Sequence, residues 1–148
     1  MRRMVSVIAV TVFAVLASAQ DAAYTPSENP FQNEYDFSLG RVIELRADVQ
    51  GVRLDAISLV AVETVQAGKP IQCEVELLGN NLSSGKVEVS AVLLLEDAAS
   101  KGLQGGRVLV DAFKVKSGKA FAQKQVVQVP GEVLTQSSKV YVLIQLQL

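Results

Sequence analysis

The strongest constraint on the fold is an alternation of apolar and polar side chains with a period of two. Residues 70–81 read PIQCEVELLGNN, and the apolar side chains from Ile71 to Leu77 occupy every second position between amides and carboxylates. Because successive side chains of a β-strand point to opposite faces, this pattern predicts a half-buried antiparallel strand. The residues GNN, 79–81, are typical of a turn and predict the end of that strand.

The same alternation recurs along the chain and predicts an all-β fold. Residues 41–58 form two extended stretches around a predicted turn at residues 48–51, with Gly51 in the left-handed position. In KVEVSAVLLLE, residues 86–96, the alternation gives way to a run that is apolar on both faces, as expected for a doubly covered strand. With about seven or eight short strands and no convincing amphipathic helix, the sequence predicts an immunoglobulin-like antiparallel β-sandwich.

Two further stretches predict a hairpin that carries a group of lysines. Residues 107–116 and 120–129 flank a short connection containing Gly118, so we expect them to pair with each other. This region contains no acidic residue between Asp111 and Glu132. A basic patch there suits an anionic polymer or an acidic partner surface, whereas the simpler interpretation is a solvated edge that discourages aggregation. The patch comprises Lys114, Lys116, Lys119 and Lys124.

The first 19 residues have the organisation of a secretory signal peptide. Arg2 and Arg3 precede an apolar run from Val5 to Leu16, and Ala17-Ser18-Ala19 is a small-residue cleavage site. The apolar run is shorter than the ~20 residues that a spanning helix needs, so an uncleaved anchor is the weaker interpretation. We therefore expect the protein to be exported, to the periplasm or the extracellular space.

Charge limits the partners of the exported chain. Removal of residues 1–19 would leave 12 basic and 15 acidic residues, a net charge of −3. That balance argues against nucleic acid or an anionic membrane as the main partner. No other apolar run is long enough to cross a membrane, so we expect no transmembrane segment after cleavage.

Residues 20–40 differ in composition from the body at 41–148, which we expect to form the sandwich domain. The segment is acidic and contains Pro26 and Pro30, which disfavour a helix or a central strand. We expect an irregular N-terminal segment whose aromatics pack on the edge of their own domain. The alternative is an arm that docks onto a partner through Tyr24, Phe31, Tyr35 and Phe37.

Cys73 is the only cysteine, and the alternation places it with the apolar side chains of its strand. We expect a buried thiol that packs as a small hydrophobic residue. A disulfide to a partner molecule remains as the alternative if the strand register is shifted by one residue. The chain has no histidine, so structural zinc lacks its usual ligands, and we expect no metal and no cofactor.

An enzyme is not expected. Without histidine the commonest general base is absent, and paired carboxylates of the kind glycosidases use remain. Glu74 and Glu76 share a strand face, but it is the face opposite the core, where exposed acids are ordinary. In a eukaryotic source, Asn81-Leu82-Ser83 would be a glycosylation acceptor, here in a predicted exposed loop.

The order of these stretches resembles the bacterial cell-adhesion-related domain (CARDB), a fibronectin type III-like sandwich. An apolar strand at 54–65, the turn Ala67-Gly68-Lys69-Pro70, an alternating strand with Asn80 at its end and a second alternating strand at 87–95 match the order in that family. The resemblance covers about residues 54–146 and implies a non-catalytic extracytoplasmic module. It departs from the family in that a final strand is missing, to be supplied by the chain itself or by a neighbouring copy.

Together these features predict a non-catalytic protein that acts through protein–protein interaction in the cell envelope or at the cell surface, as a structural, assembly or adhesion component. Self-association by strand addition is one form of that interaction. The alternative is a carrier of a small molecule or lipid in the sandwich interior, lined by Leu93 to Leu95 and the last strand, residues 139–148.

Overall fold

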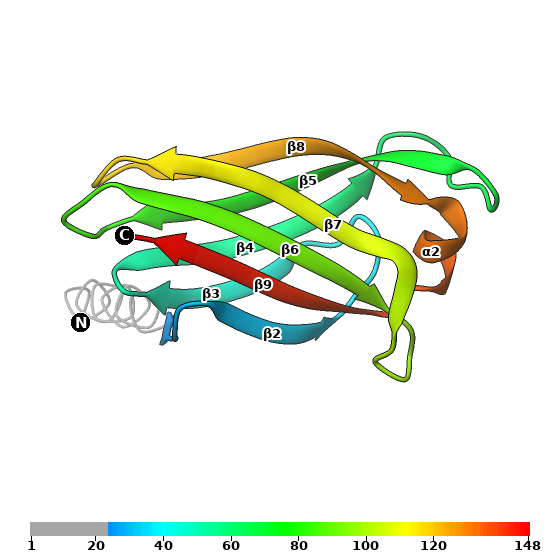
Figure 1. The fold of residues 1–148 in the computed structure, drawn as a ribbon, viewed down its shortest axis with the longest axis horizontal. Coiled ribbons are helices and arrows are strands. Elements are labelled where there is room, and N and C mark those ends of the chain that lie inside the picture. Colours follow the sequence, from blue (N-terminus) through cyan, green and yellow to red (C-terminus); the bar gives the residue numbers. More distant parts are fainter. Residues whose placement is uncertain (1–23) are drawn as a thin grey trace, which may run out of the picture.

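The computed structural model describes residues 24–148, so the predicted signal peptide, residues 1–19, lies outside the described residues. Nine strands and one short helix make up this part of the chain (Figure 1). In chain order they are β1 (Thr25–Pro26), β2 (Phe31–Asp36), β3 (Ile43–Val49), β4 (Val52–Ala61), β5 (Pro70–Asn81), β6 (Val87–Glu96), β7 (Gly102–Val115), β8 (Ala120–Pro130), α2 (Gly131–Gln136) and β9 (Lys139–Gln147).

The strands form two sheets that pack face to face. Sheet A has the order β1-β3-β4-β5-β8, and sheet B has the order β2-β9-β6-β7. All neighbouring strands pair antiparallel except β1, which runs parallel to β3 over two residues. The predicted all-β sandwich is confirmed, with nine strands where seven or eight were expected.

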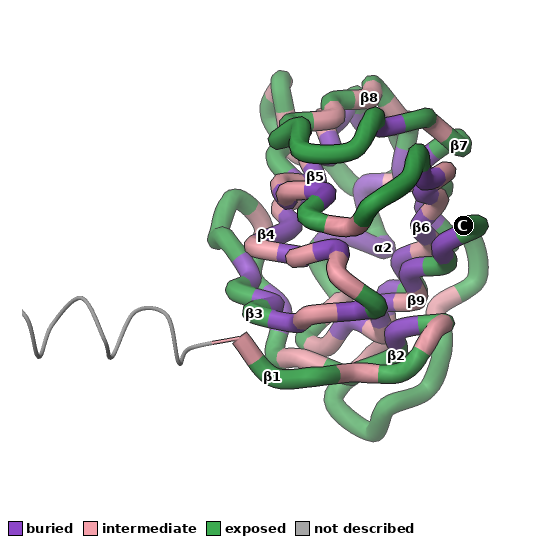
Figure 2. The backbone as a smooth tube through the Cα atoms, turned by 90° about the vertical axis from the view of Figure 1, so that its left-hand side faces the viewer, coloured by how far each residue is buried: buried purple, intermediate pink, exposed green. Residues whose placement is uncertain are grey.

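The core lies between the sheets and follows the period of two read from the sequence. In β5 every second side chain from Ile71 to Leu77 is buried, and β9 buries every second side chain from Val140 to Leu146. These residues belong to one continuous apolar cluster, and Figure 2 shows buried positions along the strands of both layers. Burial of this apolar surface is the main favourable contribution to folding.

Cys73 lies in this core, as predicted. Its side chain is 0% exposed, and its Sγ donates a weak hydrogen bond to the carbonyl of Ile71 at 3.7 Å. Burial raises the pKa of the thiol, and the nearby charge of Glu63 raises it further. The thiol is therefore kept in its uncharged form, in which it is neither nucleophile nor metal ligand.

The turn predicted at residues 48–51 joins β3 to β4 through two residues, Gln50 and Gly51. Both have positive φ, 53° and 89°, which is the conformation that a two-residue hairpin turn of the mirror-image type requires. Asp48 supports the turn because its Oδ1 accepts a hydrogen bond from the backbone N–H of Gly51 at 3.0 Å. Gly51 suits its position because glycine adopts positive φ without a steric penalty.

The predicted hairpin between residues 107–116 and 120–129 is wrong. β7 pairs with β6 in sheet B and β8 pairs with β5 in sheet A, so the connection at Gly118 crosses from one layer to the other. The two strands are linked by side chains instead. Gln125 accepts a hydrogen bond from the N–H of Asp111 at 2.8 Å and donates one to the carbonyl of Leu109 at 3.0 Å. One side-chain amide thus occupies backbone groups on the free edge of β7.

Part of the N-terminal segment is a strand of the sandwich. β2 pairs with β9 from Phe31 opposite Ile144 to Asp36 opposite Lys139, so the predicted irregular structure is wrong for residues 31–36. Pro30 precedes β2 and therefore leaves its pairing intact. The expected boundary after residue 40 does not separate this strand from the sandwich. The N-terminal segment thus supplies, from within the same chain, the strand that lies beside β9.

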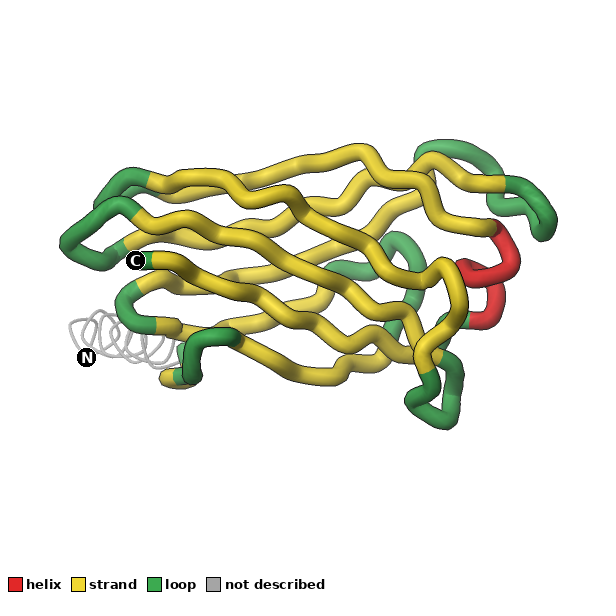
Figure 3. Tube along the Cα trace, viewed as in Figure 1, coloured by secondary structure: helices red, strands yellow, loops and turns green. Residues whose placement is uncertain are grey.

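The helix α2, which the sequence did not predict, closes one end of the sandwich between β8 and β9 (Figure 3). Val133 and Leu134 are buried and anchor it to the core. The N–H of Gly131 donates to the carbonyl of Lys69 at 2.9 Å, and a carboxylate oxygen of Glu132 accepts from the N–H of Gly68 at 2.9 Å. Six residues are too few to show a helical period in the sequence.

We expect Gly131→Ala to destabilise the fold by about 2 kcal/mol, because the added methyl group would overlap backbone atoms. Its Cβ would lie 1.8 Å from the carbonyl oxygen of Gln66. Urea unfolding of the variant and the wild-type protein measures the difference. Gly85→Ala is the matched control, because no atom lies within 4 Å of its new Cβ. Equal losses in the two variants would contradict the assignment of steric contact at residue 131.

Candidate interaction surface

An apolar patch occupies the middle of the outer face of sheet B, the face turned toward the viewer in Figure 1. Leu109 is 46% exposed and Leu94 is 36% exposed, and their neighbours on the same face are half-buried. No other described element covers this patch. We call these residues the outer-face patch, and they are Val92, Leu94, Leu109, Tyr141 and Leu143.

The strand registers assemble the patch from three strands. Leu143 of β9 lies opposite Val92 of β6, which lies opposite Leu109 of β7. In the next row, Tyr141 lies opposite Leu94. Side chains directly opposite each other on one face of a sheet are in contact range, so the five form a continuous apolar surface. Such a surface on a sheet face is typical of a site for another macromolecule.

Polar and charged residues border the patch. Gln32 and Glu34 of β2 continue the two rows on one side, and Arg107 of β7 ends the second row on the other side. The hydroxyl of Tyr141 donates a hydrogen bond to Oε1 of Gln32, which orients the aromatic ring at the border. An apolar centre with a polar border is the common anatomy of a protein–protein interface.

Two carboxylates and a lysine lie together at the border of the patch, where the second row meets the next row of residues. Glu34 Oε1 lies 3.6 Å from Lys139 Nζ and accepts a hydrogen bond from Ser100 Oγ at 3.1 Å. A hydrogen bond between the side chains of Glu96 and Glu34 lowers the pKa of Glu34. Partial burial, followed by that same contact, raises the pKa of Glu96. Oε1 of Glu96 is buried and has no hydrogen-bond partner among the described residues.

The aromatics of the predicted docking arm pack on their own domain. Phe31 and Phe37 are buried in the core, so the docking interpretation is wrong for these two side chains. Tyr35 is half-buried against the core, and this burial raises its pKa. These three side chains bury apolar surface in or against the core. In a mobile arm the same surface would be exposed to water.

Tyr24 is held on the outer face of sheet A. The guanidinium groups of two arginines lie over its ring. Cζ of Arg53 is 4.6 Å from the ring centroid, and Cζ of Arg46 is 5.8 Å from it. Its hydroxyl donates a hydrogen bond to the carboxylate of Asp55, and this bond is the main reason that the pKa of Tyr24 is raised. Tyr24 thus attaches the start of the described chain to β3 and β4.

The four lysines of the predicted patch are divided between the two sheets and the connection that joins β7 to β8. Lys124 is on the outer face of sheet A, where its Nζ lies 3.8 Å from a carboxylate oxygen of Glu74 and 3.7 Å from one of Glu76. Lys114 is in sheet B, opposite Glu88, while Lys116 and Lys119 flank the turn between β7 and β8. The acid pair considered for catalysis therefore has a lysine between its carboxylates and neutralises part of the predicted basic patch.

Asn81 is the last residue of β5 and is 0% exposed, so its prediction as part of an exposed loop is wrong. Its Nδ2 donates to the carbonyls of Gly85 at 2.9 Å and Val115 at 3.1 Å. Its Oδ1 accepts from the N–H of Ser83 at 3.0 Å and from its hydroxyl at 2.6 Å. With its amide fully bonded and buried, Asn81 does not present a nitrogen for glycosylation in the folded protein.

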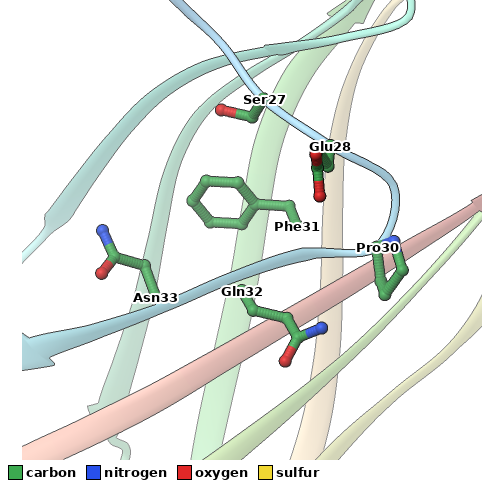
Figure 4. Close-up of a pocket in the computed structure, with 6 residues that line it drawn as sticks. All are labelled: Ser27, Glu28, Pro30, Phe31, Gln32 and Asn33. Atoms are coloured by element: carbon green, nitrogen blue, oxygen red, sulfur yellow. The ribbon is translucent and has the colours of Figure 1, made fainter.

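A surface depression of about 460 Å³ lies beside the connection from β1 to β2. Figure 4 shows its lining residues, which come from that connection and the start of β2. The connection is pinned to β9 because Asn29 donates to the carbonyl of Leu146 at 2.7 Å and accepts from its N–H at 3.0 Å. Glu28 is its only charged lining residue, so the depression has no convergent set of charges.

Residues 24–148 contain no group of three or more Asp, Glu, Cys or His side chains arranged to hold a metal ion. Within the same residues, no helix combines the length and hydrophobicity needed to cross a membrane. A comparison with models of protein families finds no match to this chain, and a search of curated proteins likewise finds none.

The sequence contained a signal for the outer-face patch that we interpreted differently. The run AVLLLE, residues 91–96, is apolar on both faces, which predicted cover on both sides of the strand. β6 is indeed central in sheet B, between β9 and β7, but only its inner face is covered by described residues. The two-sided apolar pattern therefore marks an outer face without a partner inside the described chain.

We expect Asn81→Asp to destabilise the protein by at least about 2 kcal/mol at neutral pH. The substitution would place a carboxylate oxygen against two carbonyl oxygens in a buried site, where no donor is available. Chemical denaturation of the variant measures the loss. Asn33→Asp is the control, because Asn33 is exposed and uses its side-chain oxygen as an acceptor, which the substitution retains. A similar loss in both variants would contradict the structural role of Asn81.

We expect Glu96→Gln to increase stability relative to the wild type at pH 7 more than at pH 4. Since the folded pKa of Glu96 is raised, the folded state holds its proton more tightly, and the stability contributed by that proton is lost as the pH rises above 4.5 toward the folded pKa. Glutamine keeps a donor toward Glu34 without a proton to lose.

Thermal unfolding of the wild type and Glu96→Gln at the two pH values measures this effect. Glu88→Gln removes a carboxylate from the same outer face of β6 without the contact to Glu34. A difference between wild type and Glu96→Gln that is the same at both pH values would be evidence against a raised pKa of Glu96 in the folded protein.

Proposed function

We propose that this protein is an exported, non-catalytic β-sandwich component of the cell envelope or cell surface that acts by binding protein through its outer-face patch. The single observation that carries the proposal is the apolar surface of five residues on sheet B, bordered by charges. The signal-peptide pattern of residues 1–19 supports export, to the periplasm or the extracellular space.

The character of the patch favours a protein partner. Half-buried aliphatic side chains on a flat sheet, with a tyrosine at the border, provide apolar area without a cavity. The acidic net charge expected after export disfavours polyanions as partners. The resemblance of residues 54–146 to CARDB, an extracytoplasmic module without catalytic residues, is consistent with this proposal.

The carrier interpretation has less support. Leu93 and Leu95, which were expected to line an interior site, are 1% and 0% exposed and belong to the continuous core cluster. Ile144 of the last strand is buried in the same cluster. These side chains contact each other rather than an interior volume, and Leu94 points outward into the patch.

Site-specific photo-crosslinking in the native envelope tests the proposal. A benzophenone amino acid at residue 94 or 109 is expected to form covalent adducts with protein, since both positions lie in the patch. The control position is Val126, which is 57% exposed on the outer face of sheet A. Adducts of equal yield at residue 126, or no protein adduct at residues 94 and 109, would refute a patch-specific interaction.

A further inference from the structure

We propose that the outer-face patch binds the same patch of a second copy of this chain, so that two copies of sheet B pack face to face around a two-fold axis parallel to the strands. This inference rests on the proposed interaction function and names its partner. It follows from the order of residues across the sheet.

Three rows of residues cross the outer face of sheet B from β2 to β7. The first row is Gln32, Leu143, Val92 and Leu109, and the second is Glu34, Tyr141, Leu94 and Arg107. A third row contains Asp36, Lys139, Glu96 and Gly102.

The second and third rows are complementary to themselves. A two-fold axis parallel to the strands exchanges β2 with β7 and β9 with β6, while each row stays opposite itself. Glu34 then faces Arg107 of the second copy, and Lys139 faces Glu96. Each opposite-charge contact occurs twice, as the symmetry of an isologous dimer requires.

The same operation brings the apolar side chains together. Tyr141 lies over Leu94 of the second copy, and Leu143 lies over Val92. Sheets that stack face to face pack about 10 Å apart, with their strands within roughly 30° of each other. The outer strands lie about 7 Å from the axis. An angle of about 30° between the two sheets would shift the facing side chains of these strands by about 4 Å relative to each other, a distance that an arginine side chain can span.

The charge at the β7 edge supports this occupant. Arg107 forms no ion pair within residues 24–148. The five salt bridges found there are made by other basic side chains. A two-fold axis perpendicular to the strands, passing between the first two rows, would instead place Arg107 against Leu109 and Glu34 against Gln32. Of these two axes, the one parallel to the strands pairs the cation with an anion.

The available area predicts a weak dimer. Four strands spaced about 4.8 Å apart, over about eight residues of about 3.3 Å each, give roughly 500 Å² per copy. Two copies would bury about 1,000 Å², the lower limit for a specific interface. We therefore expect a dissociation constant in the micromolar range, and the experiment is designed for concentrations up to about 500 μM.

Sedimentation equilibrium of the exported chain, produced from the full-length sequence, is the first test. We expect a monomer–dimer equilibrium that Leu109→Lys weakens by about tenfold or more, because it places a charge in the apolar centre. Val126→Lys, an exposed valine on the other sheet, should leave the equilibrium unchanged. A wild-type protein that stays monomeric up to about 500 μM overturns the proposal. A dimer that Val126→Lys weakens while Leu109→Lys does not also overturns it.

Charge exchange gives a second test that a folding defect cannot imitate. Arg107→Glu alone and Glu34→Arg alone each create two like-charge contacts in the dimer, and each should weaken it by about tenfold. An equimolar mixture of the two variants restores both opposite-charge contacts in a mixed dimer. We expect the mixture to associate about as tightly as the wild type, and failure of the mixture to associate overturns the proposed axis.

The outcomes separate this inference from the proposed function. If the wild type is monomeric but residues 94 and 109 crosslink to a different protein, the patch is an interaction site and the second copy is excluded. If neither association nor patch-specific crosslinking occurs, both proposals fail. Mass spectrometry of the sedimented protein shows whether residues 1–19 remain. If the protein associates only when these residues are present, the proposal that the two patches bind each other is overturned.

Discussion

Burial of alternate side chains between two sheets is the interaction on which the rest of this structure depends. The inner faces of both layers contribute to one apolar cluster, which includes Cys73 and reaches Phe31 at one edge. Because every second residue must enter this core, the intervening residues must point outward. The composition of the two outer faces is therefore set by the same registers that build the core, and the outer-face patch follows from them.

The connections between the layers depend on a few polar groups. The side chain of Asn81 bonds the end of β5 to Gly85, before β6, and to Val115, the last residue of β7, and its backbone pairs with Gly118 and Lys119. Gln125 joins β8 to β7 across the edge of the sandwich. Asn81 pairs buried polar groups that would otherwise be unsatisfied, and Gln125 bonds backbone groups at the exposed edge of β7, so both residues link the two sheets.

The two faces of the molecule differ in how their charges are used. On sheet A, Lys124 lies between Glu74 and Glu76, and Tyr24 covers Arg53. On sheet B, charge gathers at the border, and the centre is apolar. This asymmetry is why we place the proposed interaction surface on sheet B, although both sheets contribute strands to the same core.

The sequence by itself determined the strand class, the inward-facing positions and the buried state of Cys73, because a period of two is a local property that each strand carries alone. It did not determine which strands pair. Residues 107–116 and 120–129 are adjacent in sequence and were expected to form a hairpin, yet they lie in different sheets. The missed strand at 31–36 pairs with β9, more than a hundred residues away. Only the tertiary structure decided these pairings and placed Leu94, Leu109 and Tyr141 on one face, because opposition across strands depends on contacts between segments distant in the chain.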